Sequence, residues 1–359
     1  MYRHTKSRFN FSLLLPAIVL VIFGLVSFYI LDVQIFRQQL LALIVGIAVY
    51  SLMLFVDYRI IGYFSKYLYI LGILGLILVF IIGFEARGAA RWISIGGFSL
   101  QVSEVVKPFF LIFIAHYLSS RKTKDIMTYL KTFALFAPVF VLVLKQPDLG
   151  NALVYGSSFI FMLIMYGFPL SYFVVSALLV ILPLPLLYHT LHQYQKDRIT
   201  SFVDITHDPY GISYNAIQAL ISIGSGGFLG KGFGNSTQTL LQFLPERHTD
   251  FIFATISENL GFVGVSILIG VYVFFLYRMY KMMMNARDEF SYLVMAGFYF
   301  LFLTHVFFNI GMNIAILPIV GITLPFVSYG GSSLLTNFII LGIISQVEQK
   351  EDRDMLVIR

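Results

Sequence analysis

Long apolar segments constrain the fold of this 359-residue chain more than any other feature. About ten stretches approach the roughly 20 residues that a helix needs to cross the hydrocarbon core of a membrane. The sequence therefore predicts an all-α polytopic membrane protein with about ten transmembrane helices, organised as one integral membrane domain over residues 1–359. The expected segments are 11–30, 38–56, 67–84, 103–118, 132–145, 150–166, 170–188, 250–277, 292–311 and 319–345.

Composition agrees with a membrane protein. Hydrophobic residues make up 58% of the chain and charged residues only 12%, with a mean hydropathy of +0.86, whereas a soluble domain carries about 25% charged residues. The absence of Cys excludes a disulfide framework, a thiolate metal site and a cysteine nucleophile. The first apolar segment follows Arg3, Lys6 and Arg8 without a small-residue cleavage site, so we expect it to be an uncleaved anchor.

Basic residues predict the orientation. With an even number of spans, both termini lie on one side of the membrane. The termini and the connections on their side carry 15 of the 24 Lys and Arg residues. Because loops rich in Lys and Arg stay in the cytoplasm, both termini are expected to be cytoplasmic. The outer loops then hold most of the polar candidate residues.

The outer connection over residues 189–249 is unusually long for a loop between membrane helices. Its aromatic and glycine content predicts a folded extracytoplasmic cap with short helices. Arg198 and Lys231 could hold a phosphate there or contact lipid headgroups. The glycine-rich run at 224–234 does not match a nucleotide-binding loop, because Ser225 and Gly232 stand where the Walker A pattern needs Gly and Ser or Thr. Close backbone packing is the expected use of these glycines.

Two acids mark the eighth apolar segment. Asp250 stands at its start and Glu258 lies two turns further in. An acidic residue at the centre of a membrane helix costs about 2.5 to 3.5 kcal/mol, so such residues are functional candidates. The alternatives are that Asp250 caps its helix and that Glu258 is the buried partner of a cation.

Further candidates lie in the other outer connections. Glu104 and Lys107 are three residues apart, so they share a helical face within pairing distance. They could contact a substrate or form a structural ion pair. Asp148, in the polar turn 145–150, is either a site residue or a turn former. Arg91 adds a cation on the same side.

Four strings in the sequence resemble the SEDS family (shape, elongation, division and sporulation). They occur in the family's order and span roughly residues 85–345. Thr237-Gln238 ahead of Phe243-Leu-Pro-Glu246 is more similar to elongation members than to division members. Val102 and Asn259 depart from the pattern, where Pro and a second Glu are usual. The strings are Arg91-Trp-Ile with Gln101-Val-Ser-Glu104 and Lys107, Gln146-Pro-Asp-Leu-Gly150, the glycine-rich run followed by Leu244-Pro-Glu-Arg-His-Thr-Asp-Phe-Ile-Phe-Ala254, and Leu324-Pro-Phe-Val-Ser-Tyr-Gly-Gly-Ser-Ser333.

The resemblance implies a ten-helix peptidoglycan glycosyltransferase that polymerises lipid II on the outer face of the bacterial cytoplasmic membrane, during cell elongation and shape maintenance. The family's essential aspartate falls on Asp250, and its glutamate and lysine fall on Glu104 and Lys107. A class B penicillin-binding protein and other elongation complex proteins are the implied partners. Nucleic acid is not expected as a partner.

The implied reaction suits these residues. A sugar 4-hydroxyl needs a carboxylate to accept its proton, and Asp250 is expected to be that base. The pyrophosphate leaving group needs cations, for which Arg198, Lys107, Lys231 and Arg91 are candidates. An α-linked donor and a β1,4 product require inversion, so no covalent intermediate is needed. Asp148, Glu258 and Ser328 are further expected substrate contacts. No cofactor is predicted with certainty, which leaves room for a divalent cation.

Two other classes of function remain open at the level of sequence. Acids in membrane segments and the Gly- and Pro-interrupted stretch 311–325 also suit a lipid II flippase or another transporter of lipid-linked precursors. A scaffold without chemistry is the third reading, and it would make Asp250 dispensable. The polar candidates gather at the outer interface, whereas a transporter needs charges along a path near the midplane.

Overall fold

The computed structural model describes residues 10–86, 89–95, 98–182, 200, 208–211 and 213–357. Within this part, nine helices are long and apolar enough to span a membrane, and a shorter apolar helix, α7, covers Leu170–Ile181. Each of the ten predicted segments overlaps one of these helices. The nine are α1 (Phe11–Leu31), α2 (Val33–Met53), α3 (Tyr58–Ile82), α4 (Val102–Ser119), α5 (Ile126–Lys145), α6 (Leu149–Tyr166), α12 (Ile252–Met284), α13 (Glu289–Asn313) and α14 (Gly331–Val357).

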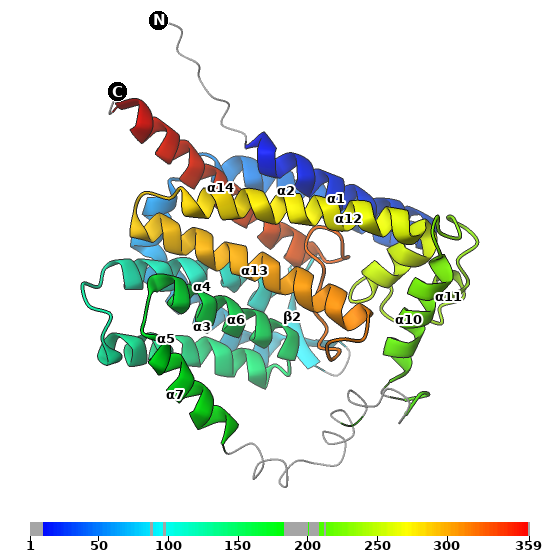
Figure 1. Ribbon diagram of the computed structural model, residues 1–359, viewed down its shortest axis with the longest axis horizontal. Coiled ribbons are helices and arrows are strands. Elements are labelled where there is room, and N and C mark those ends of the chain that lie inside the picture. Colours follow the sequence, from blue (N-terminus) through cyan, green and yellow to red (C-terminus); the bar gives the residue numbers. More distant parts are fainter. Residues whose placement is uncertain are drawn as a thin grey trace, which may run out of the picture.

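The helices form a bundle whose two ends differ (Figure 1). One end carries a small sheet, residues 314–330, and the helices α10 (Tyr214–Gly226) and α11 (Thr237–Leu240) of the long outer connection. At the opposite end α1 begins and α14 ends. Helices α4, α13 and α14 are the most buried of the spanning helices, whereas α2 and α3 expose much of their apolar surface. This arrangement suits a bundle whose outer helices face lipid.

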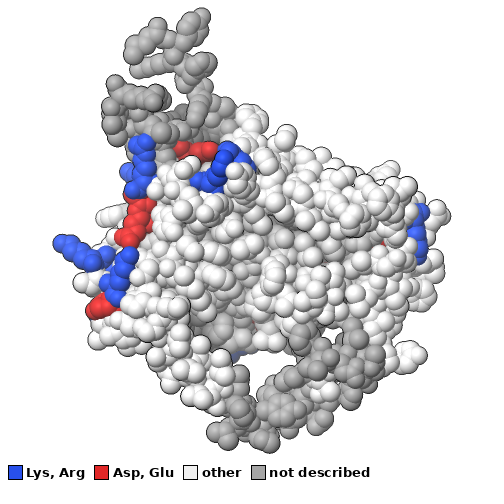
Figure 2. Space-filling model, in the orientation of Figure 1, with Lys and Arg blue, Asp and Glu red and all other residues white. Residues whose placement is uncertain are grey.

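Charged side chains are unevenly distributed over the visible surface of the bundle (Figure 2). On the face shown in Figure 2, Lys and Arg gather along the rim where α1 begins and α14 ends, and the broad band beside it shows no charged side chain among the described residues. Such a band fits the apolar core of a membrane, where charged side chains are costly.

Aspartates begin five of the spanning helices. In each case a carboxylate oxygen accepts a hydrogen bond from a backbone N–H of the first turn, which is otherwise unpaired. Helix α12 differs from these five, because its N-cap residue is Phe251 and no side chain of that residue caps it. The five capping residues are Asp32 of α2, Asp57 of α3, Asp125 of α5, Asp148 of α6 and Asp288 of α13.

Three features depart from the predicted segments. A three-stranded antiparallel sheet precedes α4, with strands β1 (Phe84–Ala86), β2 (Ala89–Ile95) and β3 (Phe98–Gln101). Helices α3, α5 and α12 extend six to nine residues into connections that were expected to be loops. The tenth segment was expected to be helical from residue 319, which is wrong, because α14 begins only at Gly331. The end of the seventh segment, residues 183–188, lies outside the described residues.

Residues 314–330 form an irregular segment that folds back into the bundle. The Tyr272 hydroxyl, from the middle of α12, donates to the carbonyl of Pro325 at 2.5 Å. The Phe326 ring packs against Phe275 and Phe302, with both ring centroids 5.7 Å away. Irregular backbone at this depth is tolerated only where protein groups satisfy it. The segment is therefore part of the core.

The glycine-rich run pairs with a break in α12. Gly261 has φ +62°, so the helix is interrupted there. The amides of Lys231 and Gly232 donate to the carbonyls of Glu258 and Asn259, both at 3.0 Å, and two amides that follow Gly261 donate back to the carbonyls of residues 227 and 228. A Cβ on Gly261 would lie 2.2 Å from the backbone nitrogen of residue 230. This close backbone contact explains the glycines.

Candidate functional site

Asp250 lies at the end of the bundle that carries the sheet and α10. Its side chain is half-buried, and it precedes the first residue of α12 by two positions. It does not cap the helix, in contrast to the five aspartates above. The position that a Cβ on Gly321 would take lies 3.4 Å from Asp250 Oδ2. The carboxylate therefore faces a turn of the re-entrant segment 314–330.

Hydrogen bonds hold the backbone before Asp250 in place. Every carbonyl from Glu246 to Asp250 accepts at least one hydrogen bond. That of Glu246 accepts from two amides nearby in the chain, and the other four accept from side chains or amides of α12, α13 and the segment 314–330. The five donors are Thr255 Oγ1 to residue 247 (3.0 Å), the amide of Tyr329 to residue 248 (2.8 Å), Ser328 Oγ to residue 249 (2.6 Å), and Asn309 and Asn313 to residue 250 (both 2.9 Å). Asp250 is thus presented by a fixed backbone.

Ser328 contributes to this frame. Its side chain is buried, and its oxygen also accepts from the amide of Leu324 at 2.8 Å. Both contacts are to the protein's own backbone. Ser328 therefore joins the re-entrant segment to the residues before Asp250.

Glu104 and Lys107 form the predicted pair on one face of α4. Their Oε1 and Nζ atoms are 2.7 Å apart, and both side chains are buried. Lys107 Nζ is also 3.3 Å from His305 Nε2, and His305 Nδ1 is 2.9 Å from the carbonyl of Thr323. The pair is therefore connected, through His305, to the same segment that contacts Asp250.

Arg91 and Asp148 anchor the sheet to the start of α6. The Arg91 guanidinium donates to the carbonyls of Gln146, at 2.9 Å, and of Pro147, and its Nη1 lies 4.0 Å from Asp148. Asp148 is 3% exposed and accepts from Gln101 Nε2 at 2.8 Å as well as from the amide of Asn151. The turn-forming role of Asp148 is thus observed directly.

Lys231 and Glu258 pair with each other. Lys231 Nζ lies 3.2 Å from Glu258 Oε1, and the Glu258 side chain is fully buried. Glu258 also accepts from the amides of Gln238 and Thr239, each at 3.0 Å, and from the Thr239 hydroxyl. Four donors occupy this carboxylate, so it fastens α11 and the glycine-rich run to α12.

The structure does not describe Arg198, which lies outside the described residues. It does add four residues that the sequence analysis missed. His305, Asn309 and Asn313 are spaced by four along α13 and form a polar stripe in an apolar helix, a pattern that could have revealed them. Arg247 is half-buried, and its Nε has no hydrogen-bond partner among the described residues. Burial lowers the pKa of Arg247.

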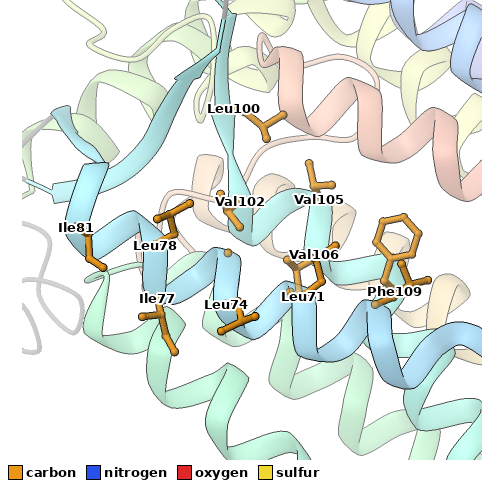
Figure 3. A pocket seen from close by; sticks show the side chains of 13 residues that line it. Leu71, Leu74, Ile77, Leu78, Ile81, Leu100, Val102, Val105, Val106 and Phe109 are labelled. Carbon is orange, nitrogen blue, oxygen red and sulfur yellow. The ribbon is translucent and has the colours of Figure 1, made fainter.

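No group of three or more His, Cys, Asp or Glu side chains within the described ranges is arranged to hold a metal ion. A groove of about 560 Å³ runs between α3 and α4, and Leu100 of β3 lines it near the sheet (Figure 3). All thirteen lining residues are apolar or Gly. A groove lined in this way suits a hydrocarbon chain better than a polar ligand.

Comparisons with known proteins agree with this architecture. A family model named for FtsW, RodA and SpoVE and described as "Cell cycle protein" matches residues 8–353. Peptidoglycan glycosyltransferase MrdB of Escherichia coli K12 is 35% identical over 319 residues, which cover 88% of this chain and 86% of MrdB. A probable peptidoglycan glycosyltransferase FtsW of Pseudoalteromonas translucida is 40% identical over 293 residues, covering 79% and 72% of the two chains.

Two solved structures are similar to this chain over nearly its whole length. The rod shape determining protein RodA of Thermus thermophilus has a TM-score of 0.73 and 28% identity, covering 96% of this chain and 97% of its own. A chain from a study entitled "Structural coordination of polymerization and crosslinking by a peptidoglycan synthase complex" has a TM-score of 0.86 and 28% identity, covering 96% and 98%.

The bundle and the frame around Asp250 define a multi-pass membrane protein with a polar site at one end. The chain belongs to the family of FtsW, RodA and SpoVE, which is the SEDS family that its motifs indicated.

Proposed function

We propose that this protein is a peptidoglycan glycosyltransferase that polymerises lipid II into glycan strands during cell elongation and shape maintenance. The structural observation that carries the proposal is the placement of Asp250. Its half-buried carboxylate stands at the start of a membrane helix that it does not cap. Each backbone carbonyl from Glu246 to Asp250 accepts a hydrogen bond, which fixes the segment that carries it. The names of the relatives support the reaction class.

Asp250 is the proposed general base. The acceptor sugar hydroxyl loses its proton to the carboxylate as its oxygen attacks the anomeric carbon of the donor, and the bond from that carbon to the pyrophosphate oxygen breaks. General-base catalysis of this kind contributes typically about 10² to 10⁴ in rate. The fixed backbone serves the reaction because a base must be held in reach of its proton.

The pyrophosphate leaving group requires positive charge nearby. Three of the expected cations, Lys107, Lys231 and Arg91, already bond to acids or carbonyls of the protein. They would therefore stabilise the charge of the pyrophosphate from a distance, without leaving these partners. Arg247 lies three residues before Asp250, and its Nε has no hydrogen-bond partner among the residues that the structure describes. We add it to Arg198 as a candidate for direct contact. A divalent cation could share this role.

We place the protein in the bacterial cytoplasmic membrane with both termini in the cytoplasm. Lys and Arg gather at the end of the bundle where α1 begins and α14 ends, as expected for the cytoplasmic side. Asp250 then lies on the outer side, where the long connection 189–249 would cap the site. A class B penicillin-binding protein is the proposed partner, since a structural neighbour belongs to a synthase complex that polymerises and crosslinks. Other elongation complex proteins are proposed partners by resemblance.

Transport of lipid II is the alternative function. The names of the relatives favour a transferase over a flippase. The buried acids Glu104 and Glu258 are each paired with a lysine and bonded to protein groups. They are therefore poorly suited to line a path for a moving substrate.

The test is polymerisation of purified lipid II by the reconstituted protein, with and without the partner, with crosslinking blocked by a β-lactam. Native protein should produce glycan strands, and Asp250→Asn, which keeps the shape of the side chain, should lower the rate by about 10² to 10⁴. Asp125→Asn is the matched control, because Asp125 caps α5 at the other end of the bundle. Absence of strands from the native protein with its partner, or equal rates from Asp250→Asn, would refute the proposal.

A further inference from the structure

A side chain of α13 caps an amide in the first turn of α12, where backbone N–H groups have no acceptor within their own helix. If α12 began one residue earlier, the amide of Ala254 would donate to the carbonyl of Asp250, four residues before it. Instead it donates to Asn313 Oδ1 at 3.1 Å, and the Asp250 carbonyl accepts from Asn313 Nδ2 at 2.9 Å. The side-chain amide of Asn313 thus stands between two groups that would otherwise bond to each other. Because Asn313 takes both of these bonds, Asp250 stays outside the helix.

Asn309, one turn earlier on α13, joins Asp250 to the re-entrant segment. Its Nδ2 donates to the carbonyl of Asp250 at 2.9 Å and to the carbonyl of Ile322 at 2.7 Å. An amide NH₂ has two hydrogens, so both are used. Asn309 and Asn313 are 0% exposed, and water does not compete for these bonds.

The turn that Asn309 holds is the one beside the carboxylate. Gly321, adjacent to Ile322, has φ +69°, a conformation that favours glycine. The absence of a Cβ leaves room beside Asp250 Oδ2. The stripe on α13 therefore fixes both the residue that carries the carboxylate and the surface that it faces.

We infer that Asn309 and Asn313 are positioning residues for Asp250, which hold it out of α12 and against the turn at Gly321. This inference rests on the proposed function, in which Asp250 is the base. Asn309 has the larger role, because it donates both to the carbonyl of Asp250 and to the carbonyl of Ile322 in the facing turn, whereas Asn313 makes no bond to that turn within the described part of the chain. Misplacing a base by about 1 Å costs on the order of a hundredfold in rate.

Two variants separate positioning from stability. Asn309→Asp keeps the size of the side chain but removes both N–H donors. Asn313→Leu removes the bridging amide, so the amide of Ala254 can bond to the carbonyl of Asp250 and the helix can extend by one residue without loss of folding stability. Thr304→Val is the matched control on the same helix, because Thr304 is buried and its hydroxyl bonds that of Ser157 at 3.0 Å, away from Asp250.

Three measurements decide the matter: kcat and KM for lipid II polymerisation, the thermal midpoint, and hydrogen–deuterium exchange of a peptide covering residues 246–256. For Asn309→Asp we expect kcat to fall tenfold to a hundredfold with KM within about twofold, and exchange in the peptide to accelerate. For Asn313→Leu we expect a lower kcat at an unchanged midpoint. The control should match the native protein in kcat and exchange.

Native kcat and native exchange in both variants would overturn the inference, and so would losses of kcat that merely follow the thermal midpoint with unchanged exchange. The exchange measurement does not depend on catalysis. If the native protein made no strands, the proposed function would fail, while faster exchange in Asn309→Asp would still establish that Asn309 positions the Asp250 segment.

Discussion

Lys107 donates a hydrogen bond to His305, and the contact fixes the protonation of the imidazole. His305 Nδ1 lies 2.9 Å from the carbonyl of Thr323, an acceptor, so Nδ1 carries the hydrogen. Nε2, 3.3 Å from Lys107 Nζ, then has a free lone pair that accepts a hydrogen bond from the ammonium group. With Glu104 2.7 Å from the same nitrogen, the cluster consists of one anion, one cation and one neutral ring.

The balance of charge in this cluster predicts strong coupling between Glu104 and Lys107. Removing one member of a buried pair leaves an uncompensated charge and costs about 3 to 5 kcal/mol. We expect Lys107→Met and Glu104→Gln each to lower the free energy of unfolding by that amount, and the double variant to lose much less than the sum. Thermal unfolding of the four proteins in nanodiscs gives the coupling energy. Additive losses would show that the two side chains do not interact.

Two glycines of α12 should respond to alanine in opposite directions. At Gly261, with φ +62°, a Cβ would lie 2.2 Å from a backbone nitrogen, so Gly261→Ala should cost more than about 2 kcal/mol. At Gly270 no atom lies within 4 Å of the added Cβ. Gly270→Ala should therefore stabilise α12 by about 0.5 to 1 kcal/mol. Thermal midpoints measured side by side test the contrast, which equal shifts of the two variants would contradict.

The ion pair of Lys231 and Glu258 is asymmetric. Glu258 is fully buried and receives four donors, whereas the Lys231 side chain is 27% exposed. We expect Glu258→Gln to cost about 3 kcal/mol and Lys231→Met about 1 kcal/mol. Limited proteolysis between residues 227 and 241 should therefore cleave Glu258→Gln much faster than Lys231→Met. Equal cleavage rates would mean that the amide donors to Glu258 contribute little.

His248 should make stability depend on pH. Burial and the nearby Arg247 lower its pKa from 6.5 to about 4, and its Nδ1 has no hydrogen-bond partner in the described part of the chain. Because the unfolded chain takes up a proton near pH 6.5 and the folded protein does not, this contribution is complete above pH 6.5 and is lost as pH falls toward 4.

The thermal midpoint of the native protein should therefore fall between pH 7 and pH 5. His248→Phe retains an aromatic ring for the edge contact with Phe28 and removes the titrating group. The variant should show a smaller fall over the same range, and identical pH profiles would assign the effect to other groups.

The sequence predicted the helices better than the segments between them. Each predicted apolar segment overlaps a helix, because length and hydrophobicity largely decide whether a segment can span a membrane. The pairing of Glu104 with Lys107 followed from their spacing. The small sheet was missed, since its strands are short and are stabilised by pairing that no local pattern reveals.

The errors concentrate where distant residues satisfy the backbone. The apolar residues 319–330 predict the start of a helix, yet the side chains of Tyr272, His305 and Asn309 bond to backbone carbonyls of this stretch. Such bonds replace those of a helix, and their donors lie on α12 and α13. The setting of Asp250 has the same origin, because it depends on two asparagines about sixty residues further along the chain.

The re-entrant segment also sets an order of assembly. Its partners on α1, α12 and α13 are synthesised before it. One of them is Gly24 of α1, where an added Cβ would lie 2.2 Å from the carbonyl oxygen of Val327. Residues 314–330 can pair their backbone only after these helices have entered the membrane and packed together. The surface that Asp250 faces is consequently completed near the end of synthesis. A chain that stalls earlier on the ribosome, or that inserts with a helix missing, would present Asp250 without that surface. The proposed site is therefore complete only in a fully inserted molecule.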